Sequence, residues 1–177
     1  VSSIKLTGGD PGLYEPMDPG LLPPLYVAYH DTLAEGTEVT HNDLRSRYNR
    51  GEAAVHAGIK RWAELTQQAR DLILAGRGRE IGPLMDANFD LRASLIHISP
   101  GNRALVETGR KLGAAVNFAG SGGAVVGCYD GNPERLRRLE EDPVASAVLH
   151  AVEGGDERNW GSPPPYLLQR VMELVPK

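Results

Sequence analysis

Three glycines between two short apolar runs are the feature that most limits how this chain can fold. The loop consists of Gly120, Ser121, Gly122 and Gly123. It separates the apolar runs at residues 114–120 and 124–129. A glycine costs roughly 0.5–1 kcal/mol relative to alanine in ordered structure, so a cluster of them indicates a geometric requirement. The segment therefore predicts two strands around a glycine loop.

This glycine loop has a functional interpretation and a structural one. Successive backbone N–H groups can converge on an anion, and the missing side chains let a phosphate approach. Alternatively, the glycines permit a tight connection or a close contact with another backbone. No Gly-Lys-Ser/Thr follows, and the loop does not open a helix after a strand. It is therefore neither a Walker-type phosphate loop nor a dinucleotide fingerprint, and both interpretations stay open.

The remaining elements predict helices packed on one face of a small sheet. An apolar run predicts a strand over residues 25–30. Apolar spacing and cap residues predict helices over about residues 40–75, 79–96, 99–113 and 132–142. Ser99 and Asn132 are the predicted caps of the last two helices. Together with the strands around the glycine loop, this order predicts an α+β fold.

The chain is expected to divide into three parts. Residues 1–20 are rich in Gly, Pro and Asp, and we expect a lead segment or strand end from a preceding domain. Residues 21–142 form the predicted main domain, and residues 143–177 a tail of uncertain structure. In the tail, residues 144–152 are consistent with a strand or a helix. The start at Val1, with a polar lead, indicates the middle of a longer polypeptide.

A second candidate site lies on the helix expected over residues 79–96. Its polar residues are Asp86, Asn88, Asp90 and Arg92. Helical spacing places the two aspartates on neighbouring turns and makes Asn88 and Arg92 a second adjacent pair. Because Phe89 should point inward, these groups could line a pocket for a polyol. The alternative is a solvated face on which Asp86 or Asp90 contacts Arg92.

Composition argues against several classes of protein. A net charge of −4 and a pI of about 5.7 disfavour nucleic acid or an anionic membrane as the main partner. No apolar stretch approaches the ~18 residues needed to cross a bilayer. The five histidines share no metal-ligand spacing, so no metal site is expected. Cys128 is the single cysteine, which favours a reducing, cytoplasmic setting.

Three segments of the chain form an ordered set. They are YEPMDPGLLPPLYVAY (14–29), LMDANFDLR (84–92) and KLGAAVNFAGSGGAVVGCYDG (111–131). The last resembles the third conserved motif of the GHMP kinases, named for galactokinase, homoserine, mevalonate and phosphomevalonate kinases. The second lies upstream at the family's usual spacing. The first resembles the opening of the carboxyl-terminal domain in glucuronokinases and their bacterial relatives.

The resemblance implies the carboxyl-terminal half of a two-domain, ATP-dependent sugar kinase with a ferredoxin-like α+β fold. The loop Gly120, Ser121, Gly122 and Gly123 would close beside the ATP phosphates and the acceptor, providing positioning and charge stabilisation. Asp86, Asn88, Asp90 and Arg92 would face the acceptor sugar, such as glucuronate. ATP and Mg²⁺ are the implied cofactors. The amino-terminal half, on the same or a separate chain, would supply the phosphate loop and the catalytic acidic residue.

Asn117 and the absence of a phosphate loop keep a rival hypothesis open, and the tail from residue 143 to 177 is a further departure from the family's ending. Relatives commonly have lysine where this chain has Asn117, and no Gly-Leu-Gly-Ser-Ser sequence occurs in the chain. The rival is a non-catalytic ferredoxin-like module that binds a ligand or a partner. Within the kinase hypothesis, the acceptor could instead be a heptose, fucose or mevalonate derivative.

Overall fold

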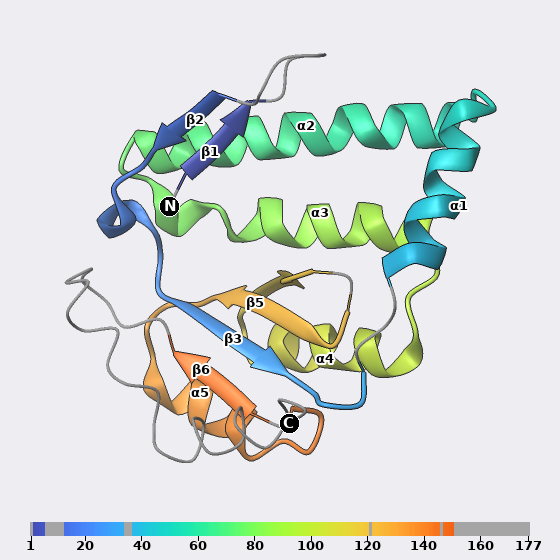
Figure 1. Cartoon of the computed structure of the whole chain (residues 1–177). Helices are drawn as coiled ribbons and strands as arrows, with labels where there is room; N and C mark the ends of the chain where they lie inside the picture. The colour runs from blue at the N-terminus through green and yellow to red at the C-terminus, as the bar shows by residue number, and fades with distance from the viewer. Residues whose placement is uncertain (1, 6–12, 34–36, 121, 146, 151–177) are drawn as a thin grey trace, which may run out of the picture.

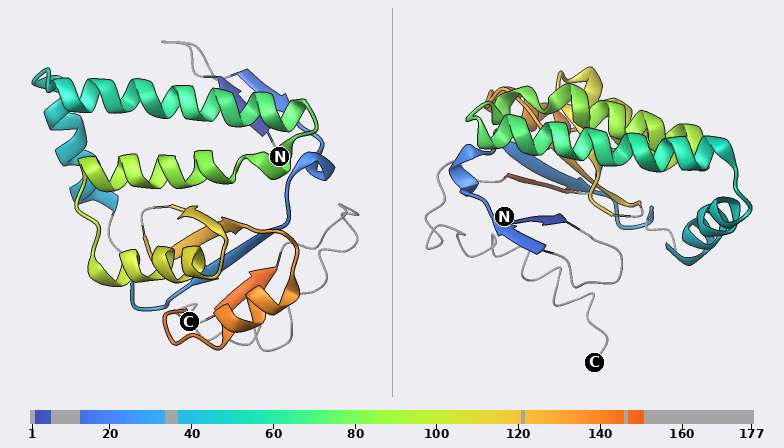
Figure 2. Two further views of the ribbon diagram at one scale, coloured as in Figure 1. Left: turned by 180° about the vertical axis from the view of Figure 1, so that it is seen from behind. Right: turned by 90° about the horizontal axis from the view of Figure 1, so that it is seen from above.

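A computed structural model describes residues 2–5, 13–33, 37–120, 122–145 and 147–150. Its centre is a four-stranded antiparallel sheet in the order β4-β5-β3-β6 (Figure 1). Helices α4 and α5 cover one face of this sheet, while α3 runs beside β4 and α2 packs on α3 (Figure 2). The predicted α+β fold, with helices over one face of a small antiparallel sheet, is confirmed.

Apolar alternation explains how the sheet meets the helices. The strands are β3 Leu25–Tyr29, β4 Ala115–Phe118, β5 Ala124–Cys128 and β6 Ala147–His150. On β3, Tyr26 and Ala28 are buried whereas Val27 and Tyr29 are partly exposed. Because side chains alternate across a strand, the buried set faces the helices. The strands predicted over residues 25–30, 114–120 and 124–129 are confirmed, each slightly shorter.

The helices follow the predicted pattern with one correction. They are α1 Thr37–Asn49, α2 Ala53–Leu74, α3 Gly82–Leu95, α4 Pro100–Lys111 and α5 Pro133–Glu140, with single 3₁₀ turns at Pro19–Leu21 and Gly78–Glu80. The one helix predicted over residues 40–75 is wrong, because the chain breaks at Gly51. This residue has a φ of 77°, and the N–H of Glu52 donates to the carbonyl of Arg47. That is a Schellman stop, which glycine favours.

The two predicted helix caps differ in outcome. Asn132 accepts a hydrogen bond from the Glu134 N–H at 3.0 Å, so this cap is confirmed. Ser99 occupies the N-cap position of α4 as predicted, but its side chain makes no capping bond to the backbone. Its hydroxyl instead accepts from the Asn102 side chain at 3.0 Å. The serine is used to position a buried asparagine rather than the helix end.

Tyr26 is the largest fully buried side chain of the core. Its ring lies against two glycines: a Cβ at Gly127 would come 2.2 Å from the ring, and one at Gly109 would come 2.4 Å from the hydroxyl. Glycine at both positions therefore lets α4 and β5 close around the tyrosine. The cluster around it joins α3, α4 and α5 to the sheet.

The ends of the described chain add two features. Strands β1 Ser2–Lys5 and β2 Leu13–Pro16 form a separate antiparallel pair. Strand β6 lies beyond residue 142, where the main domain is predicted to end, and it pairs with β3. Of the alternatives for residues 144–152, the described stretch 147–150 is therefore a strand. None of the described helices is long and apolar enough to cross a membrane.

Candidate functional site

Asp86 connects helix α3 to the edge strand β4. One of its carboxylate oxygens accepts a hydrogen bond from the Val116 backbone N–H at 3.0 Å. Val116 is fully buried, and its N–H points out of the sheet because β5 is the only described strand that pairs with β4. An unpaired N–H there would be costly. Asp86 thus provides a hydrogen-bond acceptor for a backbone N–H of the edge strand that has no partner strand on that side.

Arg110 of α4 holds both aspartates of α3. Its Nε donates to Asp86 at 2.9 Å, its Nη1 to Asp90 at 2.7 Å, and its Nη2 to the carbonyl of Asp86 at 3.0 Å. The guanidinium also lies 5.2 Å from the Phe89 ring centre. The sequence alternative in which Asp86 or Asp90 contacts Arg92 is therefore wrong. Arg110 was not predicted, because only the fold brings the end of α4 beside α3.

Asn88 lies beside the strand that carries Asn117. The Asn117 amide donates to the Asn88 side-chain oxygen at 3.0 Å and accepts from the Phe118 N–H at 2.8 Å. Trp62 on α2 donates to the Asn88 carbonyl at 3.3 Å. Both asparagines are partly exposed. The residue that replaces the family's lysine therefore belongs to a neutral amide pair.

Arg92, one turn after Asn88, reaches the glycine loop. Its Nη1 donates to the Gly120 carbonyl at 2.8 Å, and its guanidinium lies 5.4 Å from the centre of the Phe118 ring. Burial lowers the pKa of Arg92. The predicted pairing of Asn88 and Arg92 on one side of the helix is confirmed by these contacts, since both residues face β4 and its loop.

The structure requires glycine at some positions of the loop and not at others. Gly122 and Gly123 have φ values of 150° and 77°, and a Cβ at Gly122 would lie 2.9 Å from the Asn102 amide nitrogen. Gly120 is exposed, its φ is not positive, and no described atom lies within 4 Å of where its Cβ would be. Ser121 lies outside the described residues. The structural interpretation thus accounts for Gly122 and Gly123 but leaves Gly120 unexplained.

Asn102 supports the loop from the first turn of α4. It is 1% exposed, and its Oδ1 accepts from the Gly123 N–H at 2.7 Å. Its amide nitrogen donates to the Leu33 carbonyl at 3.1 Å and to the Ser99 hydroxyl at 3.0 Å. A buried amide needs such partners. This role was not predicted from the sequence, because two of the partners, Leu33 and Gly123, lie far from Asn102 along the chain.

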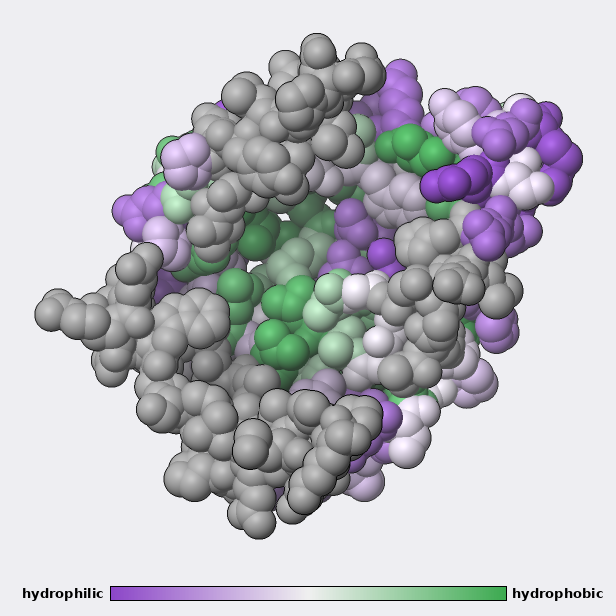
Figure 3. All heavy atoms as spheres, in the orientation of Figure 1, coloured by the Kyte–Doolittle hydropathy of each residue, from purple (hydrophilic) through white to green (hydrophobic). Residues whose placement is uncertain are grey.

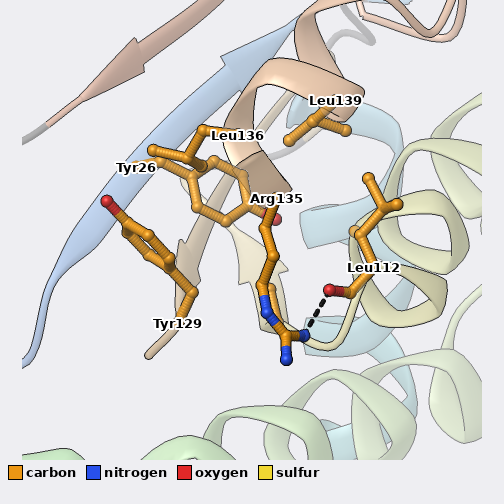
Figure 4. Close-up of a pocket in the computed structure, with 8 residues that line it drawn as sticks. Tyr26, Leu112, Tyr129, Arg135, Leu136 and Leu139 are labelled. Carbon is orange, nitrogen blue, oxygen red and sulfur yellow. Dashed lines mark hydrogen bonds between the residues drawn. The ribbon is translucent and has the colours of Figure 1, made fainter. Parts of the chain in front are cut away.

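A small cavity lies away from the glycine loop, between α4, α5 and the sheet (Figure 4). Most of its lining is apolar, including Leu112, Leu136 and Leu139, and Arg135 donates to the Leu112 carbonyl at its rim. The Tyr26 hydroxyl, which is buried here, has no hydrogen-bond partner among the described residues, and burial raises its pKa. The volume of about 10 Å³ is close to that of one water, so no sugar or nucleotide fits.

The side of the sheet that is turned away from α4 and α5 is hollowed. Figure 3 shows apolar side chains gathered in this hollow, with hydrophilic ones beside them. Val27 and Tyr29 of β3, both partly exposed, belong to the strand face on this side.

In the described part of the chain, no group of three or more His, Cys, Asp or Glu residues could hold a metal ion. Asn88, Arg92 and Gly120 form the polar candidate site, because Asn88 and Arg92 contact β4 and the loop that follows it.

Comparison with known sequences finds two similar proteins that are named as glucuronokinases. No family profile matches the chain. A probable glucuronokinase 2 from Arabidopsis thaliana is 35% identical over 141 residues, which is 78% of this chain and 38% of that protein. Glucuronokinase 1 from the same plant is 34% identical over 134 residues, 74% of this chain and 37% of that protein. The chain thus spans well under half the length of these relatives.

Comparison with solved structures identifies the fold. A mevalonate kinase from L. major, solved in complex with R-mevalonate, matches with a TM-score of 0.69 and 18% identity, over 81% of this chain and 46% of that one. A protein from Listeria innocua matches with a TM-score of 0.65 and 14% identity, over 82% and 46%. The predicted resemblance is thereby confirmed: the chain has the fold of part of a GHMP kinase and is similar in sequence to part of two glucuronokinases.

Proposed function

We propose that this chain is the carboxyl-terminal domain of an ATP-dependent sugar kinase that phosphorylates a hydroxyl of glucuronate or a closely related sugar. The sequence similarity to two glucuronokinases supports this substrate class. Because the chain covers 38% of the longer match, the proposal includes a second half, on the same or a separate chain, that holds most of the nucleotide. A cytoplasmic location belongs to the same proposal.

Gly120 is the observation that carries the proposal. Neither backbone conformation nor packing among the described residues requires glycine there. An unneeded glycine costs stability by adding freedom to the unfolded chain. A ligand that passes close to this exposed backbone accounts for the residue, because any side chain would block its approach. The neighbouring positive charge of Arg92 suits a ligand that is an anion.

Each predicted site residue has a proposed role. The backbone N–H groups of the glycine loop would bind phosphate oxygens, except that of Gly123, which donates to Asn102. Arg92 would add positive charge as the phosphoryl group moves. Asn88, with its Asn117 partner, would form hydrogen bonds with sugar hydroxyls. Asp86 and Asp90 would support the site by fixing α3 against β4 and α4, rather than contact the sugar.

ATP and Mg²⁺ fit this chain only in part. ATP would supply the phosphoryl group and Mg²⁺ would neutralise its charge. The glycine backbone and Arg92 are suitable for phosphate oxygens. The carboxylates of Asp86 and Asp90 already accept hydrogen bonds from Arg110, and the described residues provide no acidic cluster for a metal. The ligands of Mg²⁺ and the base for the acceptor hydroxyl are therefore assigned to the other half.

A non-catalytic binding module is the second candidate. Its support is Asn117, which is neutral and bonded to Asn88, where the family's lysine would place a charge. A module of this kind would keep the polyol-binding amides without the charge needed for phosphoryl transfer. Transfer of phosphate from ATP to any sugar would exclude it.

The test is Gly120→Val in the full-length protein, assayed with ATP and glucuronate. The substitution should leave the unfolding temperature unchanged, because open space surrounds the position. Turnover should fall about 100-fold or more, as when a transition-state contact is lost. Ala63→Val, on the exposed surface of α2, is the matched control and should change neither quantity. Gly122 is unsuitable because its side chain would meet Asn102.

Two results would contradict the proposal in different ways. Normal turnover of the Gly120→Val variant would exclude a ligand at the glycine loop. A wild-type protein that transfers no phosphate to any sugar would exclude the kinase and favour the binding module.

A further inference from the structure

Arg92 differs from every other partly buried arginine in the described structure. The others are Arg47, Arg70, Arg110 and Arg135, and each has a carboxylate oxygen within 3.3 Å. No carboxylate of a described residue lies within ion-pair distance of Arg92, because the two acidic residues nearby on α3 are bound to Arg110. Among the partly buried arginines of the described structure, Arg92 is therefore the one without a carboxylate partner.

The environment of Arg92 makes that charge available to a ligand. A guanidinium stays protonated in a protein, so partial burial without a counter-ion raises the free energy of the folded state. Burial also lowers the pKa of Arg92, with no opposing contribution from an acidic group. An anion bound at this position would offset the cost of burial.

The geometry around Arg92 favours an oxyanion. Its guanidinium lies against the Phe118 ring, which is buried and packs edge-on against Phe89 with ring centres 5.2 Å apart. This packing gives the planar group a rigid base. One of its five N–H donors contacts a described protein group, the Gly120 carbonyl. The other donors match the paired oxygens of a carboxylate or phosphate.

We propose that Arg92 is an oxyanion receptor. Arg92 donates to the Gly120 carbonyl through Nη1, and a bound anion would accept hydrogen bonds from the remaining N–H groups of the guanidinium. The inference rests on the proposed function, from which two sources follow: the carboxylate of a sugar acid and the phosphate being transferred. Asn88 lies one turn away on the same side of α3, in reach of sugar hydroxyls, which favours the sugar acid.

Kinetics of Arg92→Gln in the full-length protein distinguish the two sources. Charged hydrogen bonds contribute about 1.5–3 kcal/mol, so losing them should raise a KM about 10- to 150-fold. A rise in the KM for glucuronate, with little change for glucose or ATP, identifies the carboxylate. A rise in the KM for ATP identifies the phosphate. Unchanged KM values for both overturn the proposal.

Direct binding tests the receptor without turnover. Titration calorimetry with glucuronate and with inorganic phosphate should show at least one anion binding to the wild type and binding weakly to Arg92→Gln. Equal affinity of the two proteins for each anion, or no binding of either, overturns the receptor. If the wild type binds an anion through Arg92 but transfers no phosphate, the proposed kinase fails while the receptor stands.

Two further variants guard against an unrelated loss of structure. Arg61→Gln changes an exposed arginine of α2 paired with Glu64, and it should behave as the wild type in every assay. Arg92→Lys keeps the charge but lacks the planar fork. Partial recovery of anion affinity by the lysine variant supports the receptor, and a lysine variant that is no better than glutamine in a stably folded protein counts against it.

Discussion

Replacement of Asp86 by alanine should separate a structural role from the substrate role predicted from sequence. The change removes the acceptor of the Val116 N–H at 3.0 Å and one of the two carboxylates bound by Arg110. The carbonyl of residue 86 and the side chain of Asp90 would still hold Arg110. We therefore expect a stability defect that comes mainly from the edge strand.

The size of the defect follows from the contacts. A buried N–H left without a partner costs roughly 1–3 kcal/mol. The ion pair adds less than about 1 kcal/mol, because the Asp86 and Arg110 side chains are 35% and 26% exposed and water screens them. The sum for Asp86→Ala is about 1–4 kcal/mol. Asp86→Asn keeps an oxygen for Val116 and should cost about 1 kcal/mol.

Urea unfolding followed by tryptophan fluorescence measures the difference. Trp62 donates to the Asn88 carbonyl, so its signal reports the contact between α2 and α3 once Trp160, the second tryptophan, is replaced by Phe in every protein compared. The midpoint should shift by about 1 M for alanine and by less than half of that for asparagine. Asp71→Ala is the matched control, because this exposed carboxylate contacts only groups on its own helix among the described residues. It should shift the free energy of unfolding by less than about 0.5 kcal/mol.

An Asp86→Ala variant as stable as the wild-type protein would refute the structural role of Asp86. If that variant also had a raised KM for the sugar, the direct substrate role of Asp86 would be restored. Equal losses for alanine and asparagine would show that the ion pair, and not the Val116 hydrogen bond, is the main contribution.

Two other predictions concern the core. Gly127→Ala should destabilise the protein by about 1–3 kcal/mol, because its Cβ would lie 2.2 Å from the buried Tyr26 ring; an unchanged thermal midpoint would show that the ring can move aside. Cys128 is 6% exposed and burial raises the pKa of its thiol, so a thiol reagent at pH 8 should label the native protein far more slowly than the urea-unfolded protein. The raised thiol pKa should also make the free energy of unfolding fall as the pH rises above the ordinary thiol pKa. Equal labelling rates of the native and the unfolded protein would contradict the burial of the thiol, on which both predictions rest.

The sequence predicted those parts of the fold that depend on neighbouring residues. Apolar runs and glycines located β4, β5 and the loop between them, and Asn132 with Pro133 marked the start of α5. The break at Gly51 was missed, although a glycine after a helix is a common stop, because the apolar spacing of α2 was extended backward over α1.

The site was predicted less completely because its contacts are long-range. Helical spacing correctly grouped Asn88 with Arg92. The same spacing grouped the two aspartates of α3, but it could not reveal that Arg110, on another helix, would bind both. Asn102 was not predicted, since two of its three partners, Leu33 and Gly123, lie in distant segments that meet it only in the folded chain.

The dependence of the glycine loop on Asn102 has a practical consequence for protein engineering. The Gly-Ser-Gly-Gly tetrapeptide, grafted onto a hairpin of another scaffold, would transfer its composition without its conformation, because the amide that fixes Gly123 lies on α4. The transplantable unit is discontinuous: the hairpin, the first turn of α4 and the backbone at Leu33. Designers who wish to move this loop must therefore move three pieces of chain together.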